Sequence, residues 1–371
     1  KEPLVADVPI LVADSNDQDA LDAVVSQAKV VIAMAGPFFN YGKPVVDACV
    51  RFKTDYLDIT GEPDFYRDMV AAHHLQAKAA GVRIVPCSGY DSVPFDVGAF
   101  VAAEYTTRAL GARKCARVDG FLGRSSGGVS GGTVATILRC MDSTKAGDAH
   151  PLLLAPELMP GDGAVAAREG RARAPSMGGP QYHPDIQEWS CPSIMALINS
   201  KVVYRTRGLL AARAGAGGDA LIYDERTAVG GGFKGMLAAT FGTLAIYSLA
   251  AAMYFRVTRA LLAWTVLPKP GQGPSQQARD DGFFRCHFVG TAAGNSGCGD
   301  SAPRKAVAQF SYLKGDPGYR ATSLMALETA MCLLKTQKHV QAGEGGVLTP
   351  AAALGWDLVE QMRAAGFVVA V

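Results

Sequence analysis

Three side chains that can move a proton stand next to one another in a short polar loop. Tyr90, Asp91 and Ser92 lie within residues 87–94, directly after an apolar run. A phenol, a carboxyl or a hydroxyl can serve as a general acid when it lies within hydrogen-bond distance of the reacting atom. We therefore predict that Tyr90, Asp91 and Ser92 form the catalytic group. The alternative is structural, in which Asp91 caps the helix that is entered through Pro94.

Small residues follow two of the apolar runs and could let a cofactor approach the backbone. A glycine at such a place permits close contact with a ribose or a nicotinamide ring, because it carries no side chain. The predicted cofactor contacts are Ala35, Gly36, Pro37 and Phe38 after the run at 30–34, and Ser88 and Gly89 after the run at 82–86. The alternative for the first group is a turn that only redirects the chain, because Gly-Pro pairs are common in turns.

Acidic residues follow two further runs. Residues 9–13 are predicted to form a strand, and Asp14 at its end would lie near the adenine of a dinucleotide, so we add it to the predicted cofactor contacts. Asp14 could instead cap a helix that starts near Asp17. Glu62 precedes Pro63 and could orient a substrate or order a loop. It could equally stabilise a helix N-terminus, where a carboxylate interacts favourably with the helix dipole.

Strands that alternate with helices must position these residues. Strands are predicted at 30–34, 55–59 and 82–86, with a helix at 44–52 and a long amphipathic helix before the last strand. This spacing indicates a parallel sheet, whose ligands bind at the carboxyl ends of the strands. No G-x-G-x-x-G motif precedes Val30, and the chain opens with Lys1. We expect a Rossmann-like α/β domain whose first βαβ unit is missing, in a chain that is incomplete at its N-terminus.

An α+β domain is expected to follow the parallel sheet. Its predicted elements are strands at 200–207, 283–290, 306–313 and 366–371, and helices at 319–334 and 350–365. Residues 123–132 are predicted to be a flexible connector or an anion-binding turn before a helix at 133–139, and residues 159–184 an exposed insertion. The predicted domains are residues 1–114, residues 115–345, and a C-terminal helix and strand at 346–371 that could return to the first domain.

A long apolar segment interrupts the second domain. Residues 235–255 carry no charge, and the apolar character continues to residue 267. Their length corresponds to about 30 Å of helix, which is enough to cross a bilayer. Three interpretations remain open: a buried helix, a membrane span, or a segment that lies in a membrane or lipid-droplet surface. The rings of Tyr247, Tyr254 and Trp264 favour an interface.

Composition narrows the possible partners and compartments. The 36 basic and 34 acidic residues give a net charge of +2 without a dense Lys/Arg run, so no nucleic-acid partner is expected. The eight cysteines form no C-x-x-C pair, which indicates reduced thiols inside a cell and no metal site. The 371 residues are enough for two domains.

Six motifs in this chain, in this order, resemble those of the saccharopine dehydrogenase-like oxidoreductases. They lie at residues 35–49 (AGPFFNYGKPVVDAC), 56–62 (YLDITGE), 87–98 (CSGYDSVPFDVG), 271–275 (GQGPS), 315–333 (GDPGYRATSLMALETAMCL) and 346–355 (GVLTPAAALG). The sequence is most similar to the branch that contains the trans-acting enoyl reductases of lipid synthesis. This resemblance implies a Rossmann domain with a mixed α/β second domain, an NAD(P) cofactor, here NADPH, and a lipid-linked substrate. It also implies an apolar segment that associates with membranes or lipid droplets. Ser88 and Tyr90 depart from the family pattern, which has Gly-Phe-Asp at this loop.

Two functional hypotheses follow. The first is an intracellular NAD(P)-dependent oxidoreductase that binds a membrane or lipid-droplet surface through residues 235–267 and reduces an enoyl group on a lipid-like substrate. The second is a catalytically silent member of the same family that serves as a structural subunit of a membrane-bound assembly. Under either hypothesis the chain could join a protein complex or form a homo-oligomer. The family motifs favour the first hypothesis, and the missing glycine motif favours the second.

Overall fold

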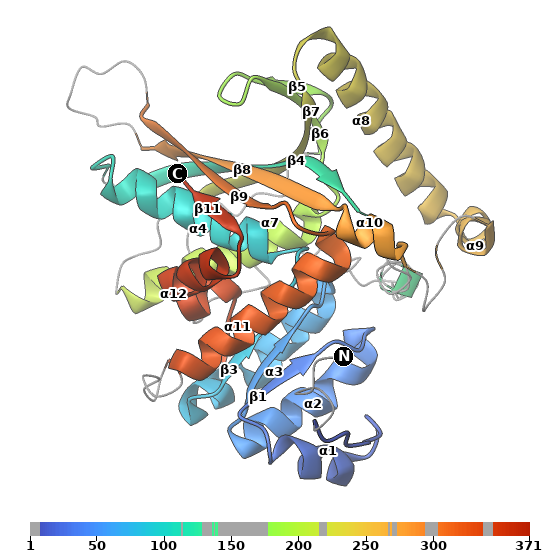
Figure 1. Ribbon diagram of the computed structural model, residues 1–371, viewed down its shortest axis with the longest axis vertical. Coiled ribbons are helices and arrows are strands. Elements are labelled where there is room, and N and C mark those ends of the chain that lie inside the picture. Colours follow the sequence, from blue (N-terminus) through green and yellow to red (C-terminus); the bar gives the residue numbers. More distant parts are fainter. Residues whose placement is uncertain are drawn as a thin grey trace.

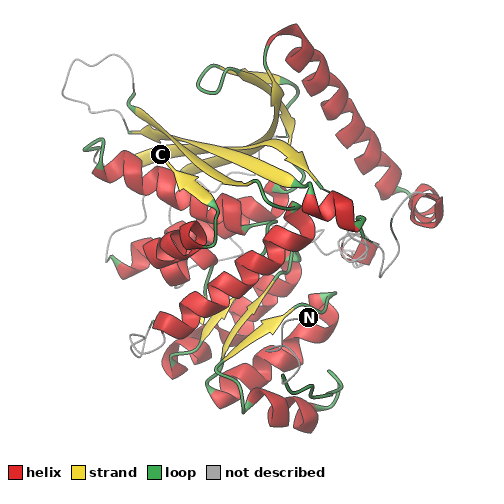
Figure 2. Ribbon diagram, viewed as in Figure 1, coloured by secondary structure: helices red, strands yellow, loops and turns green. Residues whose placement is uncertain are grey.

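Two sheets with a layer of helices between them make up the molecule (Figures 1 and 2). The computed structural model describes residues 8–112, 114–127, 136, 138–139, 177–214, 221–265, 268, 273–293, 303–336 and 344–371. Most of the predicted helix at 133–139 and residues 159–176 of the predicted insertion lie outside these described residues.

The first sheet is four-stranded and parallel, in the order β1-β2-β3-β10. Its strands are β1 (Val30–Ala33), β2 (Asp55–Asp58), β3 (Arg83–Val85) and β10 (Gly346–Val347). Helices α2 (Phe38–Phe52), α3 (Pro63–Ala80) and α4 (Val93–Arg108) follow β1, β2 and β3 in turn, and α1 (Gln18–Val25) packs against α2. The three predicted strands and their parallel arrangement are confirmed. Because all strands run in the same direction, their carboxyl ends meet at one edge of the sheet.

Two details of the N-terminal prediction are wrong. Residues 9–13 form no strand, since no described strand pairs with them and the side chains of Val8, Ile10 and Val12 are exposed. Helix α2 begins at Phe38, six residues before the predicted start at Pro44, which lies inside the helix. Its first N–H groups are satisfied by a side chain from another part of the chain, which local sequence does not reveal.

The second sheet is seven-stranded and mixed, in the order β11-β9-β8-β4-β7-β6-β5. Its strands are β4 (Cys115–Ser126), β5 (Gln181–His183), β6 (Glu188–Pro192), β7 (Ile222–Gly230), β8 (Phe283–Ala292), β9 (Lys305–Tyr312) and β11 (Val368–Ala370). The predicted strands at 283–290 and 306–313 and the terminal strand are confirmed. Strand β4 includes residues 123–126, which were predicted to be part of a flexible connector. Most of β4 and all of β5, β6 and β7 were not predicted.

Helices fill the space between the two sheets (Figure 2). They are α4, α7 (Ala196–Arg213), η4 (Pro317–Ala321), α11 (Thr322–Thr336) and α12 (Pro350–Ala364). The two predicted C-terminal helices are therefore confirmed, but the strand predicted at 200–207 is part of α7. Helix α7 is buried on several sides, between α4, α12 and β7, so its sequence lacks the one-sided apolar period of a surface helix. The C-terminal residues 346–371 contribute β10 to the first sheet and β11 to the second.

The apolar segment forms two helices at the side of the second sheet. Helix α8 (Gly232–Tyr254) packs against β6 and β7, and α9 (Arg256–Thr265) turns away from its end (Figure 1). Among the described residues, α8 is the one helix long and apolar enough to cross a membrane, and 17% of its most apolar 18-residue window is buried. The segment is thus attached to the fold along one side and exposed along the other.

Candidate functional site

The loops after β1, β2 and β3 come together at the carboxyl edge of the parallel sheet. Asp58, at the end of β2, accepts hydrogen bonds from the backbone of Thr60 (2.9 Å) and of Cys87 (3.1 Å) through Oδ1. Its other oxygen accepts a hydrogen bond from the Tyr56 hydroxyl at 2.9 Å. Burial raises the pKa of Asp58 to about 7, because desolvation disfavours the charged carboxylate. Asp58 therefore ties the loop after β3 to the loop after β2.

Glu62 joins the loop after β2 to the start of α2. Its two carboxylate oxygens accept hydrogen bonds from the backbone N–H groups of Phe38 (2.7 Å) and Phe39 (3.0 Å). The Arg139 guanidinium lies 3.1 Å from the same buried carboxylate and also forms a bidentate pair with Asp64. The predicted role of Glu62 at a helix N-terminus is therefore observed, but at α2 rather than at the helix that begins with Pro63.

Among the predicted cofactor contacts, Ala35 and Gly36 form an open backbone surface beyond β1. Both residues are exposed, whereas Pro37 is half-buried. The Phe38 side chain is buried and its ring packs 6.2 Å from that of Phe65, so it belongs to the core. A ligand at this edge would meet Ala35 and Gly36 rather than Phe38.

Ser88 and Gly89 lie at the same edge but are turned inward. The buried Ser88 hydroxyl donates to the Val85 carbonyl at 2.9 Å. A Cβ at Gly89 would lie 3.1 Å from the Thr322 methyl group and 3.2 Å from that of Ile59, so a larger residue requires these neighbours to move by a few tenths of an ångström. These two residues shape the loop, and their direct contact with a cofactor stays a prediction.

The three predicted catalytic residues have different surroundings. The backbone N–H of Tyr90 donates to Thr322 Oγ1 at 3.2 Å, and its ring meets Phe284 of the second sheet edge-on at 4.8 Å. Burial raises the pKa of Tyr90 well above its usual value. Ser92 is buried and occupies the N-cap position of α4. The alternative that Asp91 caps this helix is therefore wrong.

Asp91 is a half-buried residue of this loop, and its carboxyl is desolvated. Among the described residues, none donates a hydrogen bond to the Asp91 carboxyl that would stabilise its charged form. Desolvation therefore raises the pKa of Asp91 to about 6. A Cβ built on Gly61 would lie 3.8 Å from Asp91 Oδ2, so the carboxyl stands next to the bare backbone of the loop after β2. A carboxyl in this environment can carry a proton near neutral pH.

Asp14 lies in the segment that precedes α1. Its exposed carboxylate accepts hydrogen bonds from the backbone (2.8 Å) and the side chain (3.0 Å) of Asn16. The alternative in which Asp14 caps α1 is wrong, because Asp17 is the N-cap and accepts from the backbone of Ala20. A cofactor contact of Asp14 stays a prediction.

The sequence did not predict two polar clusters in the second sheet. The buried Glu225 accepts hydrogen bonds from Ser193 (2.8 Å) and Tyr223 (3.1 Å), and desolvation raises its pKa to about 7. No signal in the sequence marks Glu225 as different from its charged neighbours.

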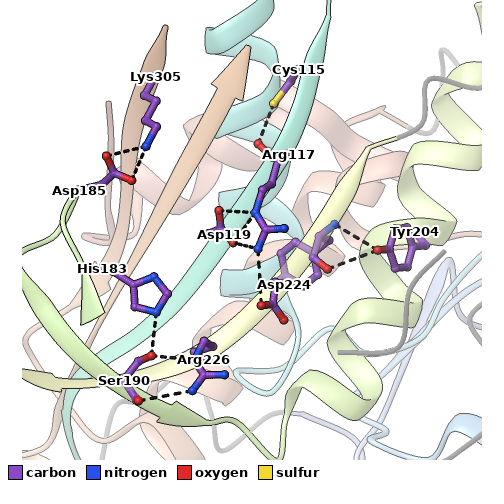
Figure 3. Close-up of polar contacts among 11 residues, drawn as sticks. Cys115, Arg117, Asp119, His183, Asp185, Ser190, Tyr204, Asp224, Arg226 and Lys305 are labelled. Atoms are coloured by element: carbon purple, nitrogen blue, oxygen red, sulfur yellow. Dashed lines mark hydrogen bonds and ion pairs between the residues drawn. The ribbon is translucent and has the colours of Figure 1, made fainter. Parts of the chain in front are cut away.

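Figure 3 shows the second cluster, which spans β4 and β7. Arg117 donates to Asp119 at 2.8 Å and lies 3.6 Å from Asp224, which faces Asp119 across the two parallel strands. The arginine offsets the repulsion between these paired carboxylates. The Tyr204 hydroxyl bonds to both backbone groups of Tyr223, at 3.1 and 3.3 Å. We assign this cluster a structural role, because its contacts join neighbouring strands. Within the described ranges, no group of three or more His, Cys, Asp or Glu side chains could hold a metal ion.

A parallel sheet whose strand-end loops combine an open glycine surface with a protonatable carboxyl defines an α/β protein of the nucleotide-binding type. Comparison with known proteins gives the family. Residues 6–85 match the saccharopine dehydrogenase NADP binding domain. The chain is 34% identical over 374 residues to the "putative trans-acting enoyl reductase" of Mycobacterium tuberculosis, covering 96% of this chain and 83% of that protein. It therefore belongs to the NAD(P)-binding saccharopine dehydrogenase-like oxidoreductases.

Two further proteins are similar over most of their length. The trans-acting enoyl reductase of Mycobacterium ulcerans is 30% identical over 385 residues, covering 99% of this chain and 86% of that protein. The apo saccharopine dehydrogenase (L-Glu forming) of Saccharomyces cerevisiae aligns in structure over 97% of this chain and 88% of that one, with 12% identity and a TM-score of 0.46.

Proposed function

We propose that this protein uses NADPH to reduce the carbon–carbon double bond of an enoyl group on a lipid-linked substrate. The observation that carries the proposal is the carboxyl of the half-buried Asp91, which is desolvated, protonatable and placed at the carboxyl edge of the parallel sheet. The relatives named trans-acting enoyl reductase support this choice of reaction.

The residues at the strand ends fit the nicotinamide half of the cofactor. Ala35 and Gly36 expose backbone without bulky side chains, as close approach of a ribose or nicotinamide ring requires. The N-terminus of α2 does not fit a phosphate, because the Glu62 carboxylate already occupies its first N–H groups. Ala35 and Gly36 would therefore hold the nicotinamide end, and the pyrophosphate would bind elsewhere.

Reduction of an enoyl group adds a hydride to the β-carbon and a proton to the α-carbon. NADPH supplies the hydride when it is bound. Asp91 holds the proton and donates it to the α-carbon, and its raised pKa keeps a useful fraction of the carboxyl protonated near pH 7. Tyr90 closes the site on the side of the second sheet through its contact with Phe284. Ser92 is buried at the start of α4, and its backbone N–H donates to the Gly89 carbonyl at 3.2 Å.

Turnover and cofactor binding test this proposal together. NADPH oxidation is followed with a trans-2-enoyl thioester in detergent, for the wild type, Asp91→Asn and the exposed-carboxylate control Asp19→Asn. We expect Asp91→Asn to lose about a hundredfold in kcat while its NADPH affinity changes less than about twofold, because the proton donor is removed and the cofactor surface is kept. Saturable NADPH binding without turnover of any enoyl substrate would contradict the reductase assignment. A complete lack of NADPH binding would favour the silent structural subunit.

We further propose that the protein acts inside the cell at a membrane or lipid-droplet surface, to which it binds through residues 235–267. The exposed apolar side of α8 supports this association. Flotation with vesicles compares the wild type with Phe241→Ser/Leu244→Ser on that side and with Leu75→Ser, a control leucine that is 77% exposed on α3. The double variant should lose at least tenfold in lipid partitioning, because each large apolar side chain gains over 1 kcal/mol on leaving water. Equal partitioning of all three proteins would refute the association.

A further inference from the structure

One side of α8 packs against the second sheet over the N-terminal half of the helix. Gly235, Ala239, Thr243 and Met253 are its buried residues, and they recur at helical spacing. A Cβ on Gly235 would lie 2.0 Å from the Gly230 carbonyl oxygen, so the helix backbone lies directly on the end of β7.

Contacts further along the helix continue this attachment. A Cβ on Gly242 would lie 3.1 Å from the Cys191 sulfur of β6, and the Tyr247 hydroxyl donates to the Met177 carbonyl. A transmembrane helix needs about 20 residues surrounded by hydrocarbon. Because α8 contacts the folded domain from Gly235 to Tyr247, it has no free stretch of that length.

Much of the surface of α8 and of α9 is exposed and apolar. The exposed large apolar residues are Phe233, Leu237, Phe241, Leu244, Tyr247, Leu249, Tyr254, Phe255, Val257, Leu261 and Trp264. Uncovered apolar surface of this extent marks an interaction site. Exposed Lys234 and Arg256 stand at the two ends of α8, where they would meet anionic headgroups.

Side chains at the bend between α8 and α9 donate hydrogen bonds to the backbone carbonyls there. Arg259 of α9 is buried and donates through Nη1 to the Met253 carbonyl at 3.0 Å. The Thr258 hydroxyl bonds to the carbonyls of Ala252 and of Phe255, the latter at 3.1 Å. Carbonyl groups at a helix C-terminus are costly in lipid when they lack donors. These contacts let the bend lie at a lipid surface without leaving those carbonyls unpaired.

We infer that α8 and α9 form an in-plane anchor that sinks its exposed side into a single lipid leaflet and does not cross the bilayer. This inference rests on the proposed lipid association and specifies its geometry. Rings at the bend and at the end of α9, Tyr254 and Trp264, then settle at the headgroup level. A single-leaflet anchor suits the phospholipid monolayer of a lipid droplet as well as a bilayer, whereas a span requires two leaflets.

Partitioning onto two lipid surfaces tests the inference. The full chain is mixed with phosphatidylcholine–phosphatidylglycerol vesicles and with triolein droplets coated by the same phospholipids. The in-plane anchor predicts partition coefficients per unit of surface within about threefold of each other. Binding to vesicles alone would overturn the inference but leave the lipid association intact. Binding to neither surface, or self-association that buries the same side without lipid, would overturn both.

Depth measurement provides an independent readout. In a Trp189→Phe/Trp356→Phe background, Trp264, which is 76% exposed, becomes the single fluorophore. Lipids brominated near the headgroup should quench its fluorescence at least twofold more than lipids brominated near the chain end. Stronger quenching by the deep bromines would show that the helix penetrates the bilayer and would overturn the in-plane geometry.

Discussion

Replacing Glu62 should lower the free energy of unfolding more than replacing an exposed carboxylate does. Glu62→Ala leaves the N–H groups of Phe38 and Phe39 without their acceptor and removes a buried partner of Arg139. An unsatisfied buried donor costs about 1–3 kcal/mol, and breaking a buried ion pair costs about 3–5 kcal/mol. Because these effects overlap and Arg139 retains Asp64, we expect a loss of about 3–5 kcal/mol in the free energy of unfolding.

Urea unfolding followed by far-ultraviolet circular dichroism measures this loss. Glu62→Gln keeps an oxygen that can accept from one N–H but removes the charge, so its loss should be about half as large. Glu360→Ala is the matched control, because Glu360 forms an exposed pair with Arg363 that contributes less than about 1 kcal/mol. If Glu62→Ala unfolded at the same urea concentration as Glu360→Ala, Glu62 would not stabilise the start of α2.

Three further outcomes are expected. The pKa of Asp91, raised to about 6, predicts that kcat falls as the pH rises above 6 because the proton donor is lost; a rate that is flat between pH 6 and 8 would count against this role. Burial raises the pKa of Asp96 to about 7, so the folded state keeps a proton that the unfolded state releases near pH 4. Stability should therefore fall between pH 4 and 7, by at most about 1.4 kcal/mol per pH unit, and Asp96→Asn should fall less steeply in calorimetry at several pH values. Gly98→Ala would place a Cβ 2.1 Å from the Phe288 ring and should cost about 1–3 kcal/mol of stability in urea unfolding, with a smaller loss in the Gly98→Ala/Phe288→Leu double variant.

The sequence predicted the parallel sheet because short apolar runs alternate with helices at regular spacing. It did not predict where α2 begins, since the capping carboxylate of Glu62 lies 24 residues away from Phe38. The strand expected at 200–207 is a helix because its surroundings bury α7 on several sides, and burial removes the periodicity that distinguishes the two structures.

The location of the candidate site was predictable, but the orientation of its side chains was not. Loops after parallel strands must meet at one edge, which brings Gly36 and Asp91 to the same side of the sheet. Whether a side chain in such a loop points outward depends on contacts from remote parts of the chain. Thr322 lies more than 230 residues beyond Tyr90 and fixes its backbone, and the Ser88 hydroxyl turns inward to Val85.

The central claim is that the exposed backbone of Ala35 and Gly36 beyond β1 binds the nicotinamide cofactor. An NADPH fluorescence titration tests this claim most directly. Gly36→Val adds a branched side chain at this exposed residue, with its Cβ 3.3 Å from the edge of the Phe38 ring, and Gly179→Val places the same side chain at a position of the second domain with nothing within 4 Å. We predict saturable NADPH binding for the wild type and for Gly179→Val, and at least a tenfold weaker affinity for Gly36→Val because the backbone can no longer approach the ring. Equal affinity of the three proteins would contradict the account.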